Sequence, residues 1–270
     1  MSLRLLFNSV VPLAFFLVLY GCEYKPKWKD FQGGIHVVLE VESKGDSSVD
    51  EQNTLRVRDI LSERMSEFGV REKVIKTNGE RRIFIQLPKF EQSQRIVDLF
   101  SQSFFLQFKL VDDESSLEEA LKGNMPPGRE ILYQTSVDPQ TGGKTGIPHL
   151  LMDQTPLTGD YIADARVAIN PQYNEPYISL SFDAKGAQIF EQLTGSNVGK
   201  RLAIVLDKNV YSAPVIQEKI PGGRAQITGR FSMEEAIDLA IALRSGAYPA
   251  HTRIIEKKEL TNDLWMGDMD

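Results

Sequence analysis

Few residues of this chain have the type and spacing that catalysis or metal binding requires. The three histidines, His36, His149 and His251, lie far apart, and none stands in an HxxxH spacing or beside a cysteine pair. Metal sites need such spacing, so we expect no metal and no cofactor. Asp160 and Asp164 are four residues apart, but the glycine before Asp160 favours a turn, and no GxSxG serine elbow occurs. The sequence therefore predicts a protein that is not an enzyme.

The triplet Gly143, Lys144 and Thr145 has the letters that end a phosphate-binding loop. The complete motif needs a glycine five positions before Gly143, and that position is Asp138, whose carboxylate would repel phosphate. Pro148 follows closely, so the segment favours a hairpin tip instead. The net charge of -6 and the absence of basic blocks argue against a nucleic-acid partner.

The one long apolar run, Val10 to Tyr20, has the length of a signal-peptide core. It ends in Leu19 to Cys22, a tetrapeptide typical of a lipobox, and Cys22 is the sole cysteine and the lipidation candidate. Residues 1–22 are therefore a signal peptide, or an uncleaved membrane anchor from Leu5 to Gly21. Either interpretation tethers the chain to the inner membrane and puts the later residues on its outer side.

Residues 30–111 predict a ferredoxin-like unit of order βαββαβ, because β-rich and helical periodicities alternate in that order. The predicted elements are a strand at 34–41, a helix at 55–68, a hairpin of strands at 70–75 and 82–87, a helix at 91–101 and a last strand at 104–111. A Ser48 to Glu51 capping box is expected before the first helix. Residues 112–156 carry loop signals, with many acidic residues, prolines and glycines, and predict a loop-rich connection.

Residues 157–250 predict a second α+β unit, and residues 251–270 a charged tail. Asp183 is expected to cap a helix through Thr194, and Ser232 with Glu235 to form a capping box for a helix ending near Gly246. The predicted strands are 166–169, 177–182, 201–206, 210–216 and 225–228. The whole chain is thus expected to be α+β with two subdomains after an amino-terminal signal or anchor.

Several distinctive strings of this chain occur in one order. They are DFQGGIHVVLEVE, RIFIQLP, LTGDYIADARV, LSFDAKGAQIFEQLT, NVGKRLAIVLDKNVYSAPVI, GGRAQITGRFSMEEA and LRSGAYPA. Together they resemble the SecD family of protein-export membrane subunits. The motif positions are Asp30, Gly33, Gly34, Thr158, Gly159, Asp160, Asp164, Arg244 and Gly246.

The resemblance implies that the first unit is the base and the second the head of an extracytoplasmic domain. In that family a bundle of membrane helices follows this domain, and nothing after Ala250 has the roughly 20 apolar residues of such a helix. The implied partners are exported unfolded polypeptides, the Sec translocon SecYEG and a SecF-like membrane subunit. The implied function is an accessory role in Sec-dependent export, with polypeptide bound as it emerges on the outer side of the membrane.

An unfolded chain exposes backbone groups and apolar side chains that a sheet edge can bind without reading sequence. The predicted hairpin strand at 210–216 makes Val210, Tyr211 and Val215 the candidate polypeptide-binding residues, with burial of that same face as the alternative. The alternative is an envelope lipoprotein that docks on the Sec complex or another assembly without binding substrate.

Overall fold

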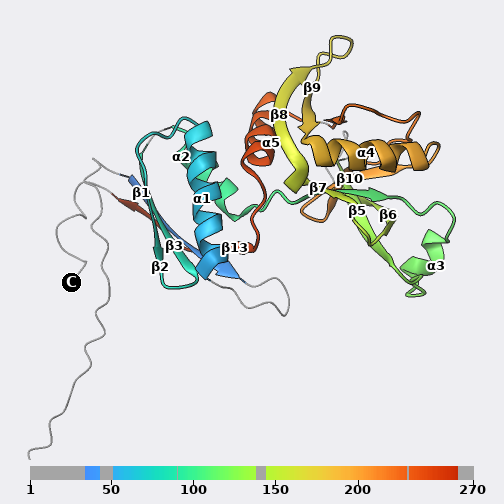
Figure 1. Cartoon of the computed structure of the whole chain (residues 1–270). Helices are drawn as coiled ribbons and strands as arrows, with labels where there is room; N and C mark the ends of the chain where they lie inside the picture. The colour runs from blue at the N-terminus through green and yellow to red at the C-terminus, as the bar shows by residue number, and fades with distance from the viewer. Residues whose placement is uncertain (1–33, 43–50, 90, 138–143, 230, 261–270) are drawn as a thin grey trace, which may run out of the picture.

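The fold is α+β and has two lobes (Figure 1). The computed structural model describes residues 34–42, 51–89, 91–137, 144–229 and 231–260. The first lobe, which we call the base, contains β1 (Gly34–Glu42), α1 (Glu51–Glu67), β2 (Val74–Asn78), β3 (Arg82–Pro88), α2 (Ser93–Asp98), η1 (Leu99–Ser101) and β13 (His251–Leu260).

The second lobe, which we call the head, contains all the other described elements. They are β4 (Leu106–Leu110), α3 (Leu117–Leu121), β5 (Arg129–Val137), β6 (Lys144–Met152), β7 (Leu157–Thr158), η2 (Gly159–Tyr161), β8 (Ile162–Ile169), β9 (Pro176–Phe182), α4 (Ala184–Ser196), β10 (Leu202–Leu206), β11 (Asn209–Ser212), β12 (Arg224–Ile227) and α5 (Met233–Ser245).

The base is a four-stranded antiparallel sheet in the order β13-β1-β3-β2, and α1 and α2 lie over it (Figure 1). Alternate residues of β1, such as Val37 and Leu39, are fully buried in a core shared with Leu61 of α1 and Ile96 of α2. This is the strand order of a ferredoxin-like unit whose last strand comes from the far end of the chain.

The prediction of the last base strand was wrong. The predicted strand, residues 104–111, contains β4, which pairs with β10 and β7 in the head. Its place beside β1 is taken by β13, which lies in the predicted charged tail. The sequence did not predict this strand because its many charged side chains favoured a tail. Charged side chains are common on edge strands such as β13, where they prevent pairing with other chains.

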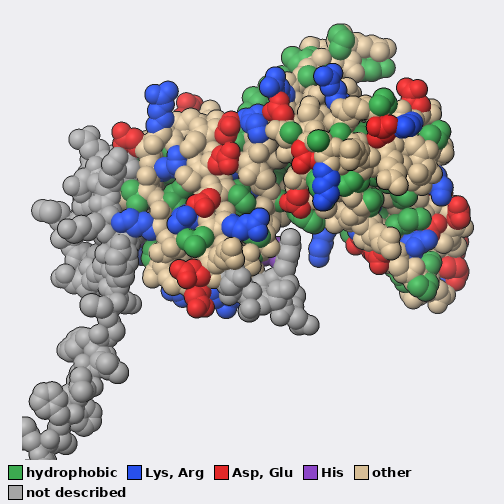
Figure 2. Space-filling view, viewed as in Figure 1, with side chains coloured by type: hydrophobic (Ala, Val, Ile, Leu, Met, Phe, Trp, Pro, Cys, Tyr) green, Lys and Arg blue, Asp and Glu red, His purple; other side chains and the backbone are tan. Residues whose placement is uncertain are grey.

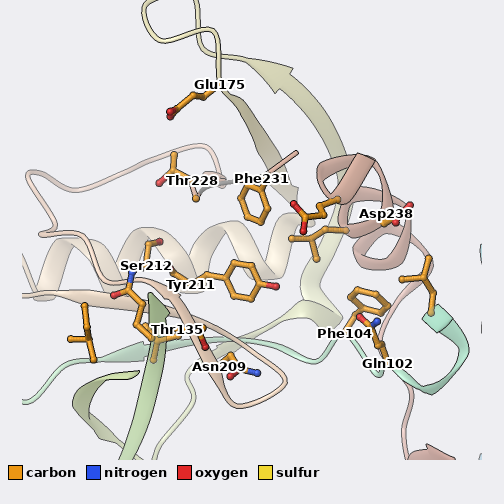
Figure 3. A pocket seen from close by; sticks show the side chains of 17 residues that line it. Gln102, Phe104, Thr135, Glu175, Asn209, Tyr211, Ser212, Thr228, Phe231 and Asp238 are labelled. Carbon is orange, nitrogen blue, oxygen red and sulfur yellow. Dashed lines mark hydrogen bonds between the residues drawn. The ribbon is translucent and has the colours of Figure 1, made fainter. Parts of the chain in front are cut away.

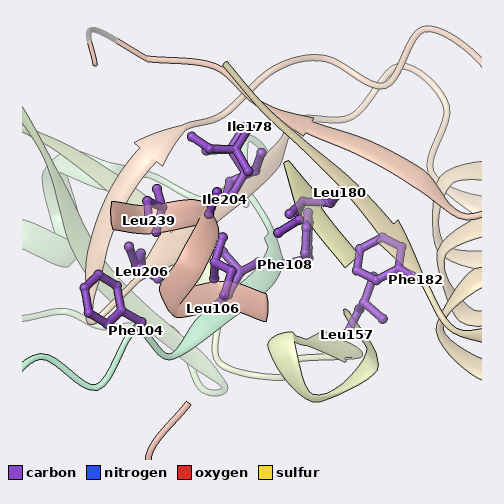
Figure 4. Close-up of a cluster of buried hydrophobic side chains, with 14 of the residues drawn as sticks. Phe104, Leu106, Phe108, Leu157, Ile178, Leu180, Phe182, Ile204, Leu206 and Leu239 are labelled. Atoms are coloured by element: carbon purple, nitrogen blue, oxygen red, sulfur yellow. The ribbon is translucent and has the colours of Figure 1, made fainter. Parts of the chain in front are cut away.

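The head contains a six-stranded sheet in the order β6-β5-β11-β10-β4-β7 and a three-stranded sheet in the order β12-β9-β8. Buried side chains from both sheets and from α4 and α5 form one core (Figure 4). Phe108, Phe182 and Phe190 meet there, with ring centroids 5.3–5.9 Å apart. Such aromatic clusters contribute both apolar burial and favourable ring geometry.

The predicted loop-rich connection, residues 112–156, is also corrected. β5 and β6 pair along nine residues each, from Arg129 opposite Met152 to Val137 opposite Lys144. The tip between them, where Asp138 and Gly143 stand, lies outside the described residues. Polar and glycine-containing strands such as β6 carry little apolar alternation, which is why the sequence favoured a loop.

The predicted helix starts of the head are confirmed. Asp183 Oδ1 accepts a hydrogen bond from Gly186 N at 2.7 Å at the start of α4. Ser232 and Glu235 form both hydrogen bonds of the capping box of α5, which ends at Gly246 with φ of 90°. Left-handed backbone at the end of a helix favours glycine. Ser48, of the other predicted capping box, lies outside the described residues.

The chain passes between base and head twice, and residues at both crossings contact one buried arginine, Arg64 of α1. Its guanidinium donates to the carbonyl oxygens of Gln102 (2.9 Å) and Ser103 (3.2 Å) on the first crossing. It also donates to Gly246 O (2.7 Å) and to Ser245 Oγ (3.1 Å) on the second. The five N–H donors of arginine suit this fork-shaped task, which a lysine could not perform.

Further contacts support the same junction. The Arg64 guanidinium carbon lies 4.1 Å from the ring centroid of Tyr248 and 4.9 Å from that of Phe104. Arg244 of α5 pairs with Glu67 of α1 at 2.5 Å. Charged side chains elsewhere are interspersed, and Figure 2 shows acidic and basic groups mixed over both lobes on the face in view.

Candidate functional site

A cleft of about 1030 Å³ opens in the head on the side of the junction (Figure 3). It is lined by residues of β5, β6, β11 and α5 and by the segment that follows β12. Gln102 and Phe104, which lie on the first crossing from base to head, also line it. Its volume is at the upper end of the range for ligand pockets in proteins. Residues distant in sequence thus meet around one open space.

A stacked aromatic pair forms part of the wall. The rings of Tyr211 and Phe231 have centroids 5.7 Å apart and planes inclined by 18°. Tyr211 is positioned by the tight turn between β10 and β11, where Asp207 and Lys208 have φ of 47° and 66°. Two successive left-handed residues are typical of a hairpin turn whose twist matches its strands. Burial raises the pKa of Tyr211, and Asp207 adds to this, so its hydroxyl stays neutral at pH 7.

Gln134 of β5 ties the two strands that border the cleft. β5 and β11 share one ladder position, Asn209 opposite Tyr133, and Gln134 Nε2 donates to Tyr211 O at 3.2 Å. On its other side Gln134 Oε1 lies 3.2 Å from His149 Nε2. Burial lowers the pKa of His149, so a neutral ring donates its Nε2–H to this oxygen.

The carboxylates that line the cleft on α5 already have partners. Glu235 Oε2 accepts from Ser232 N at 2.8 Å within the capping box. Asp238 Oδ2 accepts from Arg95 Nε at 2.9 Å across the junction. In contrast, Ser212 Oγ is buried against the cleft and has no hydrogen-bond partner among the described residues. Glu175, an exposed residue before β9, is a third carboxylate at the cleft. Apart from it, the cleft offers uncharged polar and aromatic surface that suits binding more than acid–base chemistry.

A second cavity, of about 310 Å³, lies beside the segment that continues from β11. It reaches the core residues Phe108 and Phe190, and Val215 stands at it with 44% of its surface exposed. Most of the side chains around it are apolar. A cavity of this size accommodates one large apolar side chain or a comparable group.

The three candidate binding residues have different positions. Val210 and Tyr211 line the cleft and Val215 the second cavity, although Val210 is nearly fully buried in a small core with Val205. The structure contradicts the interpretation of this hairpin as a free edge and supports the alternative, because β11 lies inside its sheet between β10 and β5. The partner strand β5 was hidden in the segment that the sequence presented as loop.

The motif residues of the head have structural partners. Thr158 lies in β7 opposite Gln107 and donates its hydroxyl to Asp160 Oδ2 at 3.0 Å. Asp164 pairs with Arg166 at 2.6 Å. These contacts do not bring Asp160 and Asp164 together as an acid–base pair.

Other motif residues lie at close approaches. A side chain at Gly159 would come within 3.3 Å of Leu106 Cβ. Arg244 donates to Ala165 O at 2.8 Å, and Gly246 accepts from Arg64. Gly34 begins β1, whereas Asp30, Gly33 and Cys22 lie outside the described residues.

Sequence reasoning missed Arg64, Gln134 and Phe231. Arg64 follows the buried Leu61 by three residues and precedes the buried Met65, so helical periodicity alone puts it on the buried face of α1. An arginine there is a detectable signal. Gln134 and Phe231 stand in segments without clear periodicity, and only the folded chain brings them to the cleft.

Within the described ranges, no helix is long and apolar enough to cross a membrane. The same part of the chain contains no group of three or more histidine, cysteine, aspartate or glutamate side chains that could hold a metal ion.

Two sequence models of known domains match the chain. Residues 130–250 match "SecDF, P1 head subdomain", and residues 54–113 match "Protein translocase subunit SecDF, P1 domain, N-terminal". The head match begins within β5, so the family's head includes the hairpin that the sequence presented as a connection.

Curated relatives agree with these matches. Protein translocase subunit SecD of Desulfurispirillum indicum is 44% identical over 211 residues, which are 78% of this chain and 41% of the relative. SecD of Calditerrivibrio nitroreducens is 44% identical over 227 residues, covering 80% of this chain and 44% of the relative. The chain thus spans less than half the length of these two relatives.

Solved structures extend the agreement to three dimensions. A crystal structure of SecDF in a super-membrane-facing form aligns with a TM-score of 0.67 at 32% identity, over 88% of this chain and 32% of that one. A second structure, from work on SecDF as a membrane component that enhances protein export, aligns with a TM-score of 0.62 at 33% identity, over 82% of this chain and 98% of that one. The base-and-head architecture is that of the P1 region of protein translocase subunits. The chain belongs to the SecD/SecDF family.

Proposed function

We propose that this chain is an accessory component of Sec-dependent protein export whose head binds unfolded polypeptide on the outer side of the membrane. The observation that carries the proposal is the cleft in the head, where the Tyr211 and Phe231 rings stack beside uncharged polar groups. Family membership supports the export role, since the relatives are protein translocase subunits.

The cleft suits an unfolded chain for a physical reason. Such a chain carries apolar side chains next to backbone amides that need hydrogen bonds. Aromatic rings contact the apolar side chains, and exposed polar residues that line the cleft, such as Asn209 and Thr228, hydrogen-bond the backbone amides without reading sequence. No chemical step is required of the site, and the role is binding, not catalysis.

The proposal includes the setting of the domain. A lipidated Cys22 or an uncleaved anchor would tether it to the inner membrane, with base and head on the outer side. Its partners would be SecYEG, a SecF-like membrane subunit and the exported polypeptides themselves. A head that holds an emerging chain would limit its backward movement through the translocon.

Binding to the purified full chain tests the proposal. The probe is a fluorescent, reduced and alkylated exported protein that stays unfolded, followed by anisotropy. We expect Tyr211→Ser to weaken binding about tenfold, as loss of a central aromatic contact does. The matched control is Tyr173→Ser, which removes an aromatic ring that is 65% exposed at the β8–β9 turn.

Two outcomes would contradict the proposal. One is that the folded wild-type protein binds no unfolded probe. The other is that both tyrosine variants bind as the wild type does. Retention of only folded envelope proteins would favour the alternative of a docking lipoprotein.

A further inference from the structure

One edge of the head is a short strand with a free side. β12 is the outer strand of the three-stranded sheet and pairs with β9 alone. Within the described residues, no backbone hydrogen bond reaches β12 on the side away from β9. Unpaired strand edges are ready templates for another extended chain.

The phase of the ladder shows which groups are free. Phe182 N donates to Gly223 O at 2.9 Å, so these two residues form a hydrogen-bonded pair. Antiparallel pairs alternate, so Ala225 and Ile227 also bond to β9, whereas the N–H and C=O of Gln226 point away from it. Gln226 therefore presents one donor and one acceptor to an incoming strand.

Both cavities lie along this same edge. Ala225 and Gln226 line the smaller cavity, and Thr228 and Gly229 line the larger cleft. Consecutive strand residues point to opposite faces of a sheet, so a cavity that touches both Ala225 and Gln226 lies at the edge of β12.

The opposite wall is also shared by the two cavities. Tyr211 and Ser212 line the larger cleft, and Val215 and Ile216 line the smaller cavity. Figure 3 shows Thr228 across the cleft from Ser212, whereas the rings of Phe231 and Tyr211 are stacked on each other. The two cavities thus lie one after the other between β12 and residues 211–216.

We infer that the polypeptide proposed above binds here as an added strand on β12, with one apolar side chain in each cavity. The inference rests on the proposed function and specifies its binding mode. Gly229 is four positions after Ala225, which corresponds to about 13 Å of extended chain. The preferred ligand is an extended segment with large apolar residues at positions i and i+4, which point to one face of a strand.

The test uses a fluorescein-labelled twelve-residue peptide with phenylalanine at positions 4 and 8 and serine, threonine and glycine elsewhere. Gln226→Pro removes the free N–H and leaves the bonds to β9 intact, a position where a sheet edge tolerates proline. We expect it to weaken binding to the full chain about tenfold, whereas the control Gln226→Ala stays within about twofold.

A second arm changes only the peptide and so does not depend on the variant folding. Two further peptides carry N-methyl groups on alternate backbone nitrogens between the two phenylalanines, and the methylated positions of the second are shifted by one residue. One of the two should bind the wild-type protein about tenfold more weakly than the unmethylated peptide, because only alternate N–H groups of an added strand face β12. Moving the second phenylalanine from position 8 to position 7 should also weaken binding, because it then points to the opposite face.

The outcomes separate this inference from the proposed function. If Tyr211→Ser weakens binding but Gln226→Pro and both methylated peptides bind as their parents do, strand addition is wrong and the cleft remains the polypeptide site. If neither the peptide nor the unfolded protein binds the wild type, the proposed function itself is overturned.

Discussion

The base and the head differ in how completely their sheets are covered by other elements. In the base, two helices cover a sheet whose inward residues, such as Val37, Leu39 and Ile85, are fully buried. The head has a larger core, yet its two sheets leave a cleft and a second cavity between them. The difference agrees with our proposal that the base supports and orients the head and that polypeptide binds in the head.

The junction shows that the two regions are not independent. Arg64 of the base holds both chain crossings, and the crossing residues Gln102 and Phe104 also line the cleft. The base therefore fixes one end of the proposed binding surface. Variants at the junction, in the head and in the base should separate these roles.

The largest effect is expected at the junction. Arg64→Ala leaves the carbonyl oxygens of Gln102, Ser103 and Gly246 without their donor, and each buried group left unpaired is costly. We expect the free energy of unfolding to fall by about 3 kcal/mol or more. Urea unfolding measures this, and amide exchange should show loss of protection in both lobes.

The control for this variant is Arg58→Ala on the same helix. Arg58 pairs at 2.6 Å with its neighbour Asp59, which is 67% exposed, so its loss should change stability by less than about 0.5 kcal/mol. Equal effects of the two variants would show that the junction does not couple the lobes.

The next effect is confined to the head and depends on pH. Asp112 accepts from Arg129 Nε at 2.5 Å and from the backbone N–H groups of Glu114 and Ser115, and these bonds hold the pKa of its carboxyl well below the usual range. A lowered pKa stabilises the fold above the unfolded value near pH 4, and this contribution is lost as pH falls towards the folded value.

Asp112→Asn should therefore cost about 2 kcal/mol at pH 7. The difference from the wild type should shrink below about pH 4, where the wild-type carboxyl begins to lose this advantage. Denaturant unfolding from pH 7 to pH 3 measures it. A difference that stays constant with pH would show that the ionised form of Asp112 contributes nothing.

The smallest effect concerns one helix of the head. Ser232→Ala removes the side chain that accepts from Glu235 N at 3.1 Å, and loss of such a cap costs about 1 kcal/mol. Amide exchange should increase in α5 and the strands that pack on it. Ser101→Ala, at an exposed serine of the base, should leave exchange in both lobes unchanged.

Local signals predicted the local elements well. The caps at Asp183 and Ser232 depend on residues close in sequence, and the structure has them. The partners of β4 and β13 could not be predicted in this way, because sheet order depends on contacts across nearly the whole chain. The cleft depends on the same long-range contacts, so the sequence indicated Tyr211 but not Phe231 or Gln134.

Photocrosslinking in cells tests the central claim most directly. A photoreactive amino acid replaces Tyr211 or Val215 in the full chain while a secretory protein is stalled in the translocon. The matched control position is Leu121 on α3, which is 49% exposed and lines neither cavity. A parallel Cys22→Ser strain tests the tether. We predict crosslinks to the stalled chain from 211 and 215 but not from 121, and weaker ones without Cys22 if lipidation is the tether. Crosslinks from 121 alone, or from none of the three positions with the protein folded and exported, would contradict polypeptide binding in the head.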